Sequence, residues 1–239
     1  MIQKNRVQPY YLIDAGRPST GIEIKTMRDI KQRLFEEFPH TRELLVPTRY
    51  MEIADIKPDR TISEAFQLIL EEKPLGRQYD WISRFCKQFG IGEIELCIHR
   101  DDKAHDVIAP FVKEFQEEQS SFHRLDEDDT RISEREHLLF QYFRFPIFNL
   151  TKLDMADIAE EHNWSALMNM TWFCHHPRRE RTPCGKCKPC IYAMEEGLGW
   201  RIPKSRRFLH YVGKVAYVRV WRKGTVAIMQ RMKAIFSSS

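Results

Sequence analysis

Four cysteines within 17 residues are the feature that most constrains how this 239-residue chain can fold. They follow the spacing Cys174-x9-Cys184-x2-Cys187-x2-Cys190, whereas the other two cysteines of the chain stand apart in apolar surroundings. Zn²⁺ prefers four ligands of this kind in a tetrahedron, and a shell closed by four protein ligands is structural rather than catalytic. The spacing therefore predicts a small zinc knuckle whose metal ligands are Cys174, Cys184, Cys187 and Cys190.

The residues between these cysteines suit a metal knuckle. Gly185 permits a tight turn, and Pro183 and Pro189 stiffen the segment, which reduces the entropy lost when the ligands close on the metal. Zinc with four thiolates carries a net negative charge, which neighbouring cations would offset. These cations are Arg178, Arg179, Arg181, Lys186 and Lys188.

Three other interpretations of the cluster stay open at this point. An iron–sulfur cluster also uses Cys-x2-Cys-x2-Cys spacing, and the cysteines could be free structural thiols. His175 or His176, beside Cys174, could replace one ligand. Zinc is preferred because four cysteines already fill its shell, so we expect both histidines near the metal or at the surface.

Composition describes a folded, soluble chain. Hydrophobic residues make up 42% and charged residues 30%, which excludes a disordered, collagen-like or coiled-coil protein. No apolar run approaches the roughly 18 to 20 residues that a membrane-spanning helix needs. Residues 1–6 lack the basic-then-apolar pattern of a signal peptide, so we expect a cytoplasmic protein.

The charges are unevenly distributed. Residues 197–239 carry ten Lys and Arg and no Asp or Glu, whereas residues 1–196 carry 28 basic against 34 acidic side chains. We call residues 203–239 the basic tail. It could contact nucleic acid or an anionic membrane surface, or lie as a solvated face over the acidic body. Its segment Phe208–Trp221 fits a strand or a helix, and the candidate stacking residues there are Tyr211, Tyr217 and Trp221 among Arg207, Lys214, Arg219, Arg222 and Lys223.

Strands and helices alternate along the first part of the chain. Residues 7–13 have the β-branched and aromatic content of a strand, and a polar turn at residues 14–19 leads into a helix whose capping box is Thr20–Glu23. Residues 94–99 predict another strand, followed by a helix around residues 108–115. This order predicts an α/β fold with a parallel sheet and crossover helices. Further expectations are helices from Ser63 to Leu70, from Tyr79 to Phe89 ending at Gly90, and from Lys152 to His162 capped by Thr151, with a loop or solvated helix face at residues 117–136.

Residues 169–174 (NMTWFC) and 183–190 (PCGKCKPC) resemble the zinc-binding motif of the 7-cyano-7-deazaguanine synthase (QueC) family, in which T-W-x-C is followed by C-G-x-C-x-x-C. Asp14, Gly16 and Arg17 fall where that family carries its D-x-G-Q-R turn. Residues 94–102 resemble the family's strand ending near an acidic loop, and residues 146–158 the helix before the knuckle. The resemblance covers residues 7–202.

The resemblance implies an N-type ATP pyrophosphatase (PP-loop) fold, which is adenine nucleotide alpha hydrolase-like. Such enzymes activate 7-carboxy-7-deazaguanine by adenylation, take up ammonia and dehydrate the amide to a nitrile with a second ATP, in queuosine-type base biosynthesis. ATP with Mg²⁺ and a small carboxylate are then the expected ligands. Asp14, Gly16 and Arg17 would line the nucleotide pocket, and His99, Asp101 and Asp102 would face the reacting carboxylate. Arg17 may equally be a solvated turn residue, and either aspartate may be a helix cap.

The family's phosphate loop, S-G-G-x-D-S, is absent from this sequence, which contains no Gly-Gly pair. We therefore expect residues upstream of Met1 to supply the first strand and this loop, and the chain as written not to turn over ATP. The expected domains are residues 1–165 (ATP-pyrophosphatase-like), 166–202 (zinc-binding) and 203–239 (basic tail). The alternative is a catalytically silent zinc protein that binds a nucleobase, nucleic acid or a partner through the basic tail.

Overall fold

The computed structural model describes residues 5–118 and 120–208. The chain divides into two compact units, an N-terminal unit (Met1–Trp172) and a C-terminal unit (Phe173–Ser239). Most of the basic tail, including the candidate stacking residues from Tyr211 to Trp221, lies outside the described residues. The expected domain boundaries after residues 165 and 202 stay predictions.

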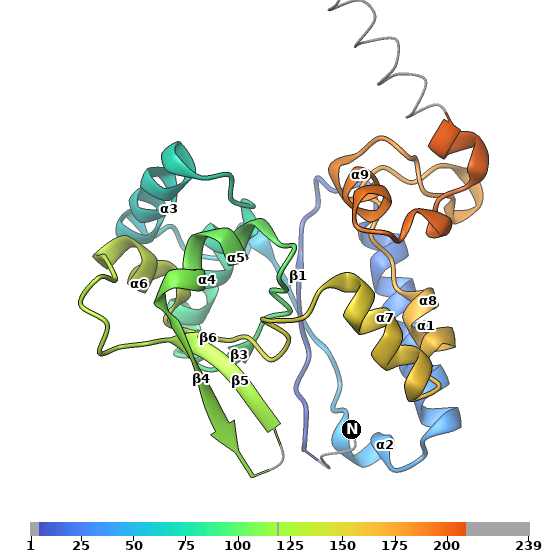
Figure 1. Ribbon diagram of the computed structural model, residues 1–239, viewed down its shortest axis with the longest axis horizontal. Helices are drawn as coiled ribbons and strands as arrows, with labels where there is room; N and C mark the ends of the chain where they lie inside the picture. The colour runs from blue at the N-terminus through green and yellow to red at the C-terminus, as the bar shows by residue number, and fades with distance from the viewer. Residues whose placement is uncertain (1–4, 119, 209–239) are drawn as a thin grey trace, which may run out of the picture. The chain divides into compact units, whose positions relative to one another are not determined.

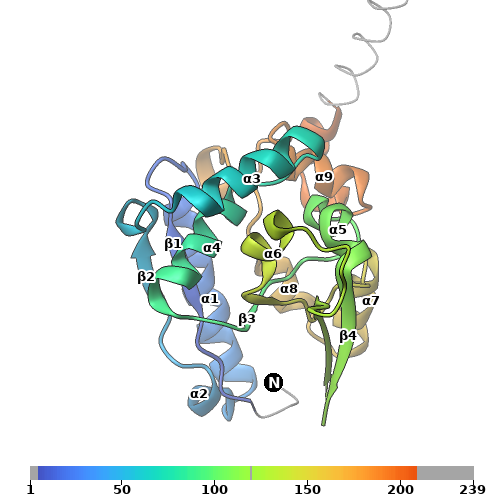
Figure 2. The same cartoon turned by 90° about the vertical axis from the view of Figure 1, so that its left-hand side faces the viewer.

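The N-terminal unit begins with a parallel strand pair, seen in Figures 1 and 2. Strand β1 (Tyr10–Ile13) pairs with β2 (Arg49–Glu52), with Tyr10 opposite Arg49 and Ile13 opposite Glu52. Between them run helices α1 (Thr20–Glu37) and α2 (Thr41–Leu44), so the connection is a crossover, as the sequence predicts. The short helix η1 (Ile53–Asp55) follows β2.

The capping box predicted at Thr20–Glu23 is wrong, because Thr20 is the first helical residue and no capping box forms. Ser19 is the N-cap of α1, and its side chain makes no capping hydrogen bond. The Ser19 hydroxyl instead donates to the Glu23 carboxylate at 2.5 Å, and the same carboxylate accepts from Tyr11 at 2.7 Å. Glu23 thus connects the N-cap residue of α1 to β1.

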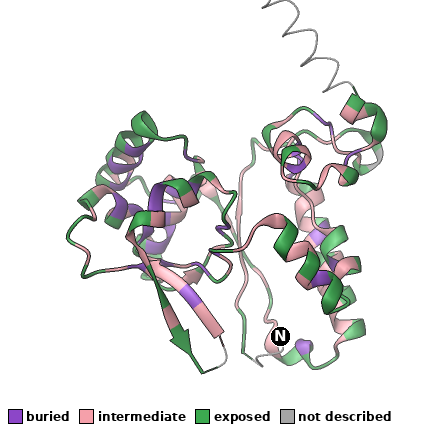
Figure 3. Ribbon diagram, in the orientation of Figure 1, coloured by how far each residue is buried: buried purple, intermediate pink, exposed green. Residues whose placement is uncertain are grey.

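Helices α3 (Arg60–Glu72), α4 (Gln78–Phe89) and α6 (Glu134–Phe140) surround the main hydrophobic core. Helix α3 starts before the predicted Ser63 because the Asp59 carboxylate accepts a hydrogen bond from the Ile62 N–H at 3.1 Å. Helix α4 ends at Gly90 in the left-handed conformation (φ 60°), as predicted. Figure 3 shows the buried residues of α3 and α4 gathered along one side of each helix.

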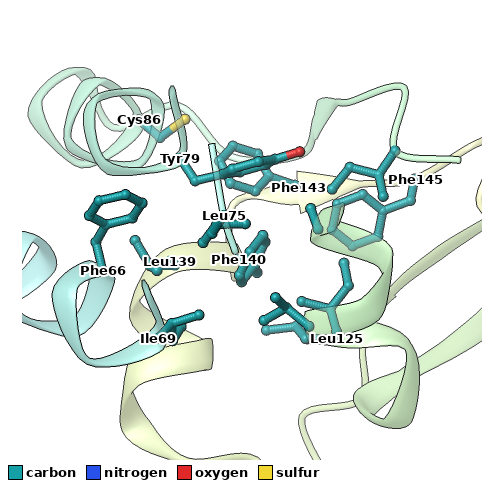
Figure 4. Packing of buried hydrophobic residues seen from close by; sticks show 14 of the residues in the cluster. Phe66, Ile69, Leu75, Tyr79, Cys86, Leu125, Leu139, Phe140, Phe143 and Phe145 are labelled. Carbon is teal, nitrogen blue, oxygen red and sulfur yellow. The ribbon is translucent and has the colours of Figure 1, made fainter. Parts of the chain in front are cut away.

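Phe140 lies at the centre of this core, with no exposed surface (Figure 4). Its ring centroid lies 5.4 Å from that of Tyr79 and 6.5 Å from that of Phe143. The buried Ser83 hydroxyl on α4 lies 2.7 Å from the carbonyl oxygens of Tyr79 and Leu139, so it is satisfied while it links α4 to α6.

The helix predicted around residues 108–115 is wrong in its second half. Helix α5 (Lys103–Ile108) and the turn η2 (Ala109–Phe111) end there, and β4 (Val112–Glu117) pairs antiparallel with β5 (Ser120–Leu125). The stretch predicted as a loop or solvated helix face therefore contains a strand with Phe122 and Leu125 buried. Phe115 and Phe122 stack across the hairpin at 5.9 Å, a non-local contact that overrides the local helical spacing.

The described residues form a mixed α/β structure with three two-stranded sheets. Strand β3 (Ile94–Glu95) pairs parallel with β6 (Phe143–Arg144), and an antiparallel bridge between His123 and Phe145 connects β5 to the same region. The strand predicted over residues 94–99 is hydrogen-bonded as a strand only at its start. A single parallel sheet with crossover helices of the adenine nucleotide alpha hydrolase type stays a prediction.

Helix α7 (Lys152–Glu161) closes the N-terminal unit together with α8 (Ser165–Met170), which packs against α1. Thr151 caps α7 as predicted, in a capping box with Asp154. Within the described ranges, no helix combines the length and the apolar composition that crossing a membrane demands. The C-terminal unit contains η3 (Arg179–Arg181), α9 (Lys188–Glu195) and η4 (Gly199–Arg201).

The core predicts the cost of a truncation on α6. Leu139 is fully buried, so Leu139→Ala should lower the free energy of unfolding by about 2 to 5 kcal/mol. Leu68→Ala on α3 is the matched control, because Leu68 is 50% exposed and its truncation should cost under about 1 kcal/mol. Urea unfolding of both variants tests this, and equal midpoints would contradict the packing.

Candidate metal centre

The side chains of Cys174, Cys184, Cys187 and Cys190 converge, with all four Sγ atoms within 4.8 Å of one another. The Sγ atoms of Cys184 and Cys190 lie 4.0 Å apart, and those of Cys174 and Cys187 lie 3.8 Å apart. A tetrahedron with Zn–S bonds of about 2.3 Å has S···S edges of about 3.8 Å. The four-cysteine cluster therefore has the dimensions to hold a metal such as zinc.

Helix α9 positions two of the four thiols. Cys187 is its N-cap residue and Cys190 lies in its first turn, where Pro189 is tolerated because an N–H there has no partner inside the helix. Negative charge is favoured at a helix N-terminus, so these positions suit thiolates. Cys174 arrives from the segment after α8, and Cys184 begins the turn that leads into α9.

Gly185 is required by the geometry of that turn. Its φ is +75°, a backbone conformation that residues other than glycine rarely adopt. A Cβ at this position would also lie 2.7 Å from the Cβ of Arg206. The predicted role of Gly185 in a tight turn is confirmed, and the contact with Arg206 adds a reason that the sequence did not reveal.

Backbone N–H groups point at the sulfurs. Lys186 and Cys187 donate to Cys184 Sγ at 3.5 and 3.3 Å, and the N–H of Cys184 donates to Cys174 Sγ at 3.2 Å. Such donors stabilise thiolates, the form that binds metals. These bonds come from the turn itself, so charge compensation does not depend on the basic side chains alone.

The thiols differ in how readily they ionise. Burial raises the pKa of Cys174 to about 11 and raises that of Cys190 further. Burial also acts on Cys184, but the N–H donors of Lys186 and Cys187 outweigh it and lower its pKa to about 7. Cys184 therefore ionises more readily than Cys174 and Cys190, and a metal has to displace the protons of those two.

A surface pocket of about 610 Å³ lies beside the cluster. His175 and His176 line it rather than entering the group of four sulfurs, and His176 is exposed. The lining also includes Arg178, Lys186 and Lys188, three of the cations that the sequence places around the cluster. The pocket thus joins the thiols to a basic surface.

Asp14, Gly16 and Arg17 form one turn between β1 and α1. Asp14 accepts hydrogen bonds from the Gly16 N–H through Oδ1 and from the Arg17 N–H through its carbonyl oxygen, both at 3.0 Å. The Arg17 guanidinium lies 3.8 Å from carboxylate oxygens of both Asp14 and Glu23. The three candidate nucleotide-pocket residues are therefore neighbours, although these contacts also suit a structural turn.

His99, Asp101 and Asp102 also lie together, in the turn that precedes α5. The N–H of Asp101 donates to Nδ1 of the buried His99 at 3.2 Å, and the Asp101 carboxylate lies 3.9 Å from the same nitrogen. Asp101 accepts from the Lys152 N–H at 3.1 Å, and Asp102 caps α5 through the Ala104 N–H at 2.8 Å. Both carboxylates thus lie at helix N-termini. This agrees with the alternative interpretation, in which they are helix caps. A catalytic role for the three stays a prediction.

Sequence reasoning missed Arg206 as part of the centre. It lies 21 residues after Gly185, and no spacing rule connects an arginine to a distant glycine. The available signal was the basic run Lys204-Ser205-Arg206-Arg207, which lies at the start of the basic tail.

Comparison with known proteins connects this geometry to one family. Residues 83–198 match the family model described as Queuosine biosynthesis protein QueC. The matched region contains His99, Asp101, Asp102 and all four clustered cysteines, and over it the chain is QueC-like. No curated protein and no solved structure matches the chain.

The cluster predicts one zinc ion per chain, lost when a ligand is removed. Cys174→Ser, Cys184→Ser, Cys187→Ser or Cys190→Ser should each lower the zinc content of the purified protein well below one equivalent, because serine oxygen is a poor replacement for a thiolate. Cys97→Ser is the matched control, since Cys97 is exposed and lies outside the cluster. Elemental analysis measures the metal. Full zinc retention in all four variants, or iron in the wild type, would contradict a zinc centre.

Gly185 predicts a second, purely steric effect. Gly185→Ala should destabilise the knuckle by about 1 to 3 kcal/mol because of its positive φ, and the contact with Arg206 should add to this cost. Gly92→Ala is the control, because a Cβ there meets nothing within 4 Å. Faster zinc release to a chelator from Gly185→Ala than from Gly92→Ala is the expected result, and equal release rates would contradict it.

Proposed function

We propose that the protein is a QueC-like ATP-dependent ligase that converts 7-carboxy-7-deazaguanine, or a related carboxylate, to the nitrile in queuosine-type base biosynthesis. The observation that carries this proposal is the match of residues 83–198 to the QueC family model, together with four converging cysteines inside that region. The proposal places the protein in the cytoplasm, with ATP, Mg²⁺ and ammonia as co-substrates.

The metal has a structural role in this proposal. Four cysteines complete a tetrahedral shell and leave no position for water or substrate, so zinc would not act as a Lewis acid. It would instead fix residues 174–190, which connect α8 to α9.

The chemistry is assigned to the two turns of the N-terminal unit. ATP would supply the adenylate: the substrate carboxylate attacks the α-phosphorus and pyrophosphate leaves, then ammonia displaces AMP to give the amide. The amide oxygen would then attack the α-phosphorus of a second ATP with release of pyrophosphate, and would leave as part of AMP as the nitrogen loses two protons and the nitrile forms. Asp14, Gly16 and Arg17 would contact the nucleotide, with the Arg17 guanidinium, held only by 3.8 Å ion pairs, free to turn towards a phosphate. His99, Asp101 and Asp102 would position the carboxylate.

The phosphate loop remains the open requirement of this proposal. No S-G-G-x-D-S sequence is present in the 239 residues, so the proposal includes in-frame residues upstream of Met1 that carry it. If such residues are lacking, the alternative of a catalytically silent zinc protein that binds a nucleobase, nucleic acid or a partner is favoured.

A direct assay tests the proposal. The chain as given and a form extended by the in-frame upstream codons are incubated with 7-carboxy-7-deazaguanine, ATP, Mg²⁺ and ammonium, and mass spectrometry detects the nitrile and AMP. We expect product from the extended form. Arg17→Gln should slow it by about a hundredfold if Arg17 contacts phosphate, whereas Arg28→Gln, exposed on α1, should not. Zinc-loaded protein without turnover in either form would contradict the ligase and leave the silent zinc protein.

A further inference from the structure

The two units carry opposite net charge. Residues 173–208 contain nine Lys and Arg against three Glu, whereas residues 1–172 contain 23 Lys and Arg against 31 Asp and Glu. The excess of positive charge therefore begins before the basic tail, since residues 173–202 alone contain six Lys and Arg against three Glu. One zinc ion with four thiolates has a net charge of about −2, so it would neutralise only about two of the positive charges in this unit.

Cations in the two units also differ in their partners. In the N-terminal unit, Arg135 binds Glu72 at 2.5 Å, and Arg144 pairs with both Glu93 and Glu117. Six cations in the described part of the C-terminal unit, by contrast, form no ion pair. They are Arg178, Arg179, Lys186, Lys188, Lys204 and Arg206. Solvated cations without acidic partners are available for a polyanion.

These cations gather around two adjoining pockets. The 610 Å³ pocket beside the thiols is lined by Arg178, Lys186 and Lys188. A second pocket of about 520 Å³ is lined by Arg178, Arg179 and Arg206. Because Arg178 borders both, the pockets form one continuous basic surface, which we call the knuckle surface. A ligand that extends across both pockets would need at least two separate negative charges.

Exposed aromatic rings accompany the cations in the same unit. Trp200 is 57% exposed in η4, which packs against α9, and Phe208 is 66% exposed two residues after Arg206. Exposed aromatics of this size are costly in water, and nucleobases stack on such rings irrespective of sequence. Basic pockets combined with stacking rings are typical of proteins that bind single-stranded nucleic acid.

We infer that the knuckle surface binds single-stranded nucleic acid. Arg178, Lys186, Lys188 and Arg206 contact successive backbone phosphates, and the bases stack on Trp200 or Phe208. Concave basic pockets favour this ligand over a flat anionic membrane, because separate phosphates of one strand can enter the two hollows. The inference does not depend on ATP chemistry, and it places the site on residues 175–208, which include only the first six residues of the basic tail.

Fluorescence anisotropy on the zinc-loaded full chain tests the inference. The probes are fluorescein-labelled 15-nucleotide oligo(U) RNA and oligo(dT) DNA, which share the phosphodiester backbone and separate RNA from DNA preference. Two double variants, Lys186→Gln/Lys188→Gln and Arg178→Gln/Arg206→Gln, should each weaken binding by about tenfold or more. Each should reduce the slope of log affinity against log salt by about 1.4, corresponding to two phosphate contacts.

The matched control is Lys25→Gln/Arg28→Gln, which removes two exposed cations from α1 and should leave the affinity unchanged. Trp200→Ala should weaken binding by about tenfold through lost stacking, whereas Tyr50→Ala, a 44% exposed aromatic on β2, should not. Zinc content is measured for every variant. If Lys186→Gln/Lys188→Gln loses zinc, the affinity of the Arg178→Gln/Arg206→Gln variant tests the inference instead, since its residues lie outside the segment from Cys184 to Cys190.

Three results would overturn the inference. One is no binding of either strand at low salt. Another is wild-type affinity in a zinc-retaining Arg178→Gln/Arg206→Gln variant, which would assign binding to residues 209–239. The third is binding to vesicles of phosphatidylcholine and phosphatidylserine without binding to either oligonucleotide, which would identify a membrane surface.

Discussion

The convergence of four thiols is the interaction on which the C-terminal unit depends. Among the described residues of that unit, the only buried hydrophobic side chains besides three of the cysteines are Ala193 and Ile202. Burial of this size contributes a few kcal/mol at most, far less than the entropy cost of ordering some thirty residues of turns. A bound metal would supply the missing free energy, since structural zinc can contribute about 10 to 16 kcal/mol to folding. The N-terminal unit has the opposite character, with a core of aromatic and aliphatic side chains around Phe140.

The same cations serve two purposes in the knuckle. Zinc with four thiolates has a net charge of about −2, and N–H groups of the turn already stabilise the Cys184 thiolate. The described cations around the cluster exceed what that charge requires. Their surplus stays on the surface, at Arg178 between the two pockets and at Lys186 and Lys188 beside the sulfurs. The basic side chains that would compensate the charge of the metal centre therefore also create a surface that attracts anions.

Local signals in the sequence predicted what local interactions determine. The N-cap at Thr151, the left-handed Gly90 and the cysteine spacing each depend on residues within a few positions of one another, and the structure has all three. Predictions failed where a distant partner decides. Val112–Phe115 has helical spacing but pairs with β5, the strand predicted over residues 94–99 is shortened, and Arg206 reaches Gly185 from 21 residues away. Such contacts have no signature in sequence spacing.

The turn at His99, Asp101 and Asp102 shows why a structural and a catalytic role are hard to separate. A carboxylate that caps a helix is held in one orientation by backbone N–H groups, which is also what a group that positions a substrate needs. Asp101 belongs to both the His99 neighbourhood and the N-terminus of α7, so its removal would alter helix stability and any substrate position together. Activity and unfolding free energy must therefore be measured on the same variant. A loss of turnover that exceeds what the loss of a cap, about 1 kcal/mol, can produce would indicate contact with the substrate.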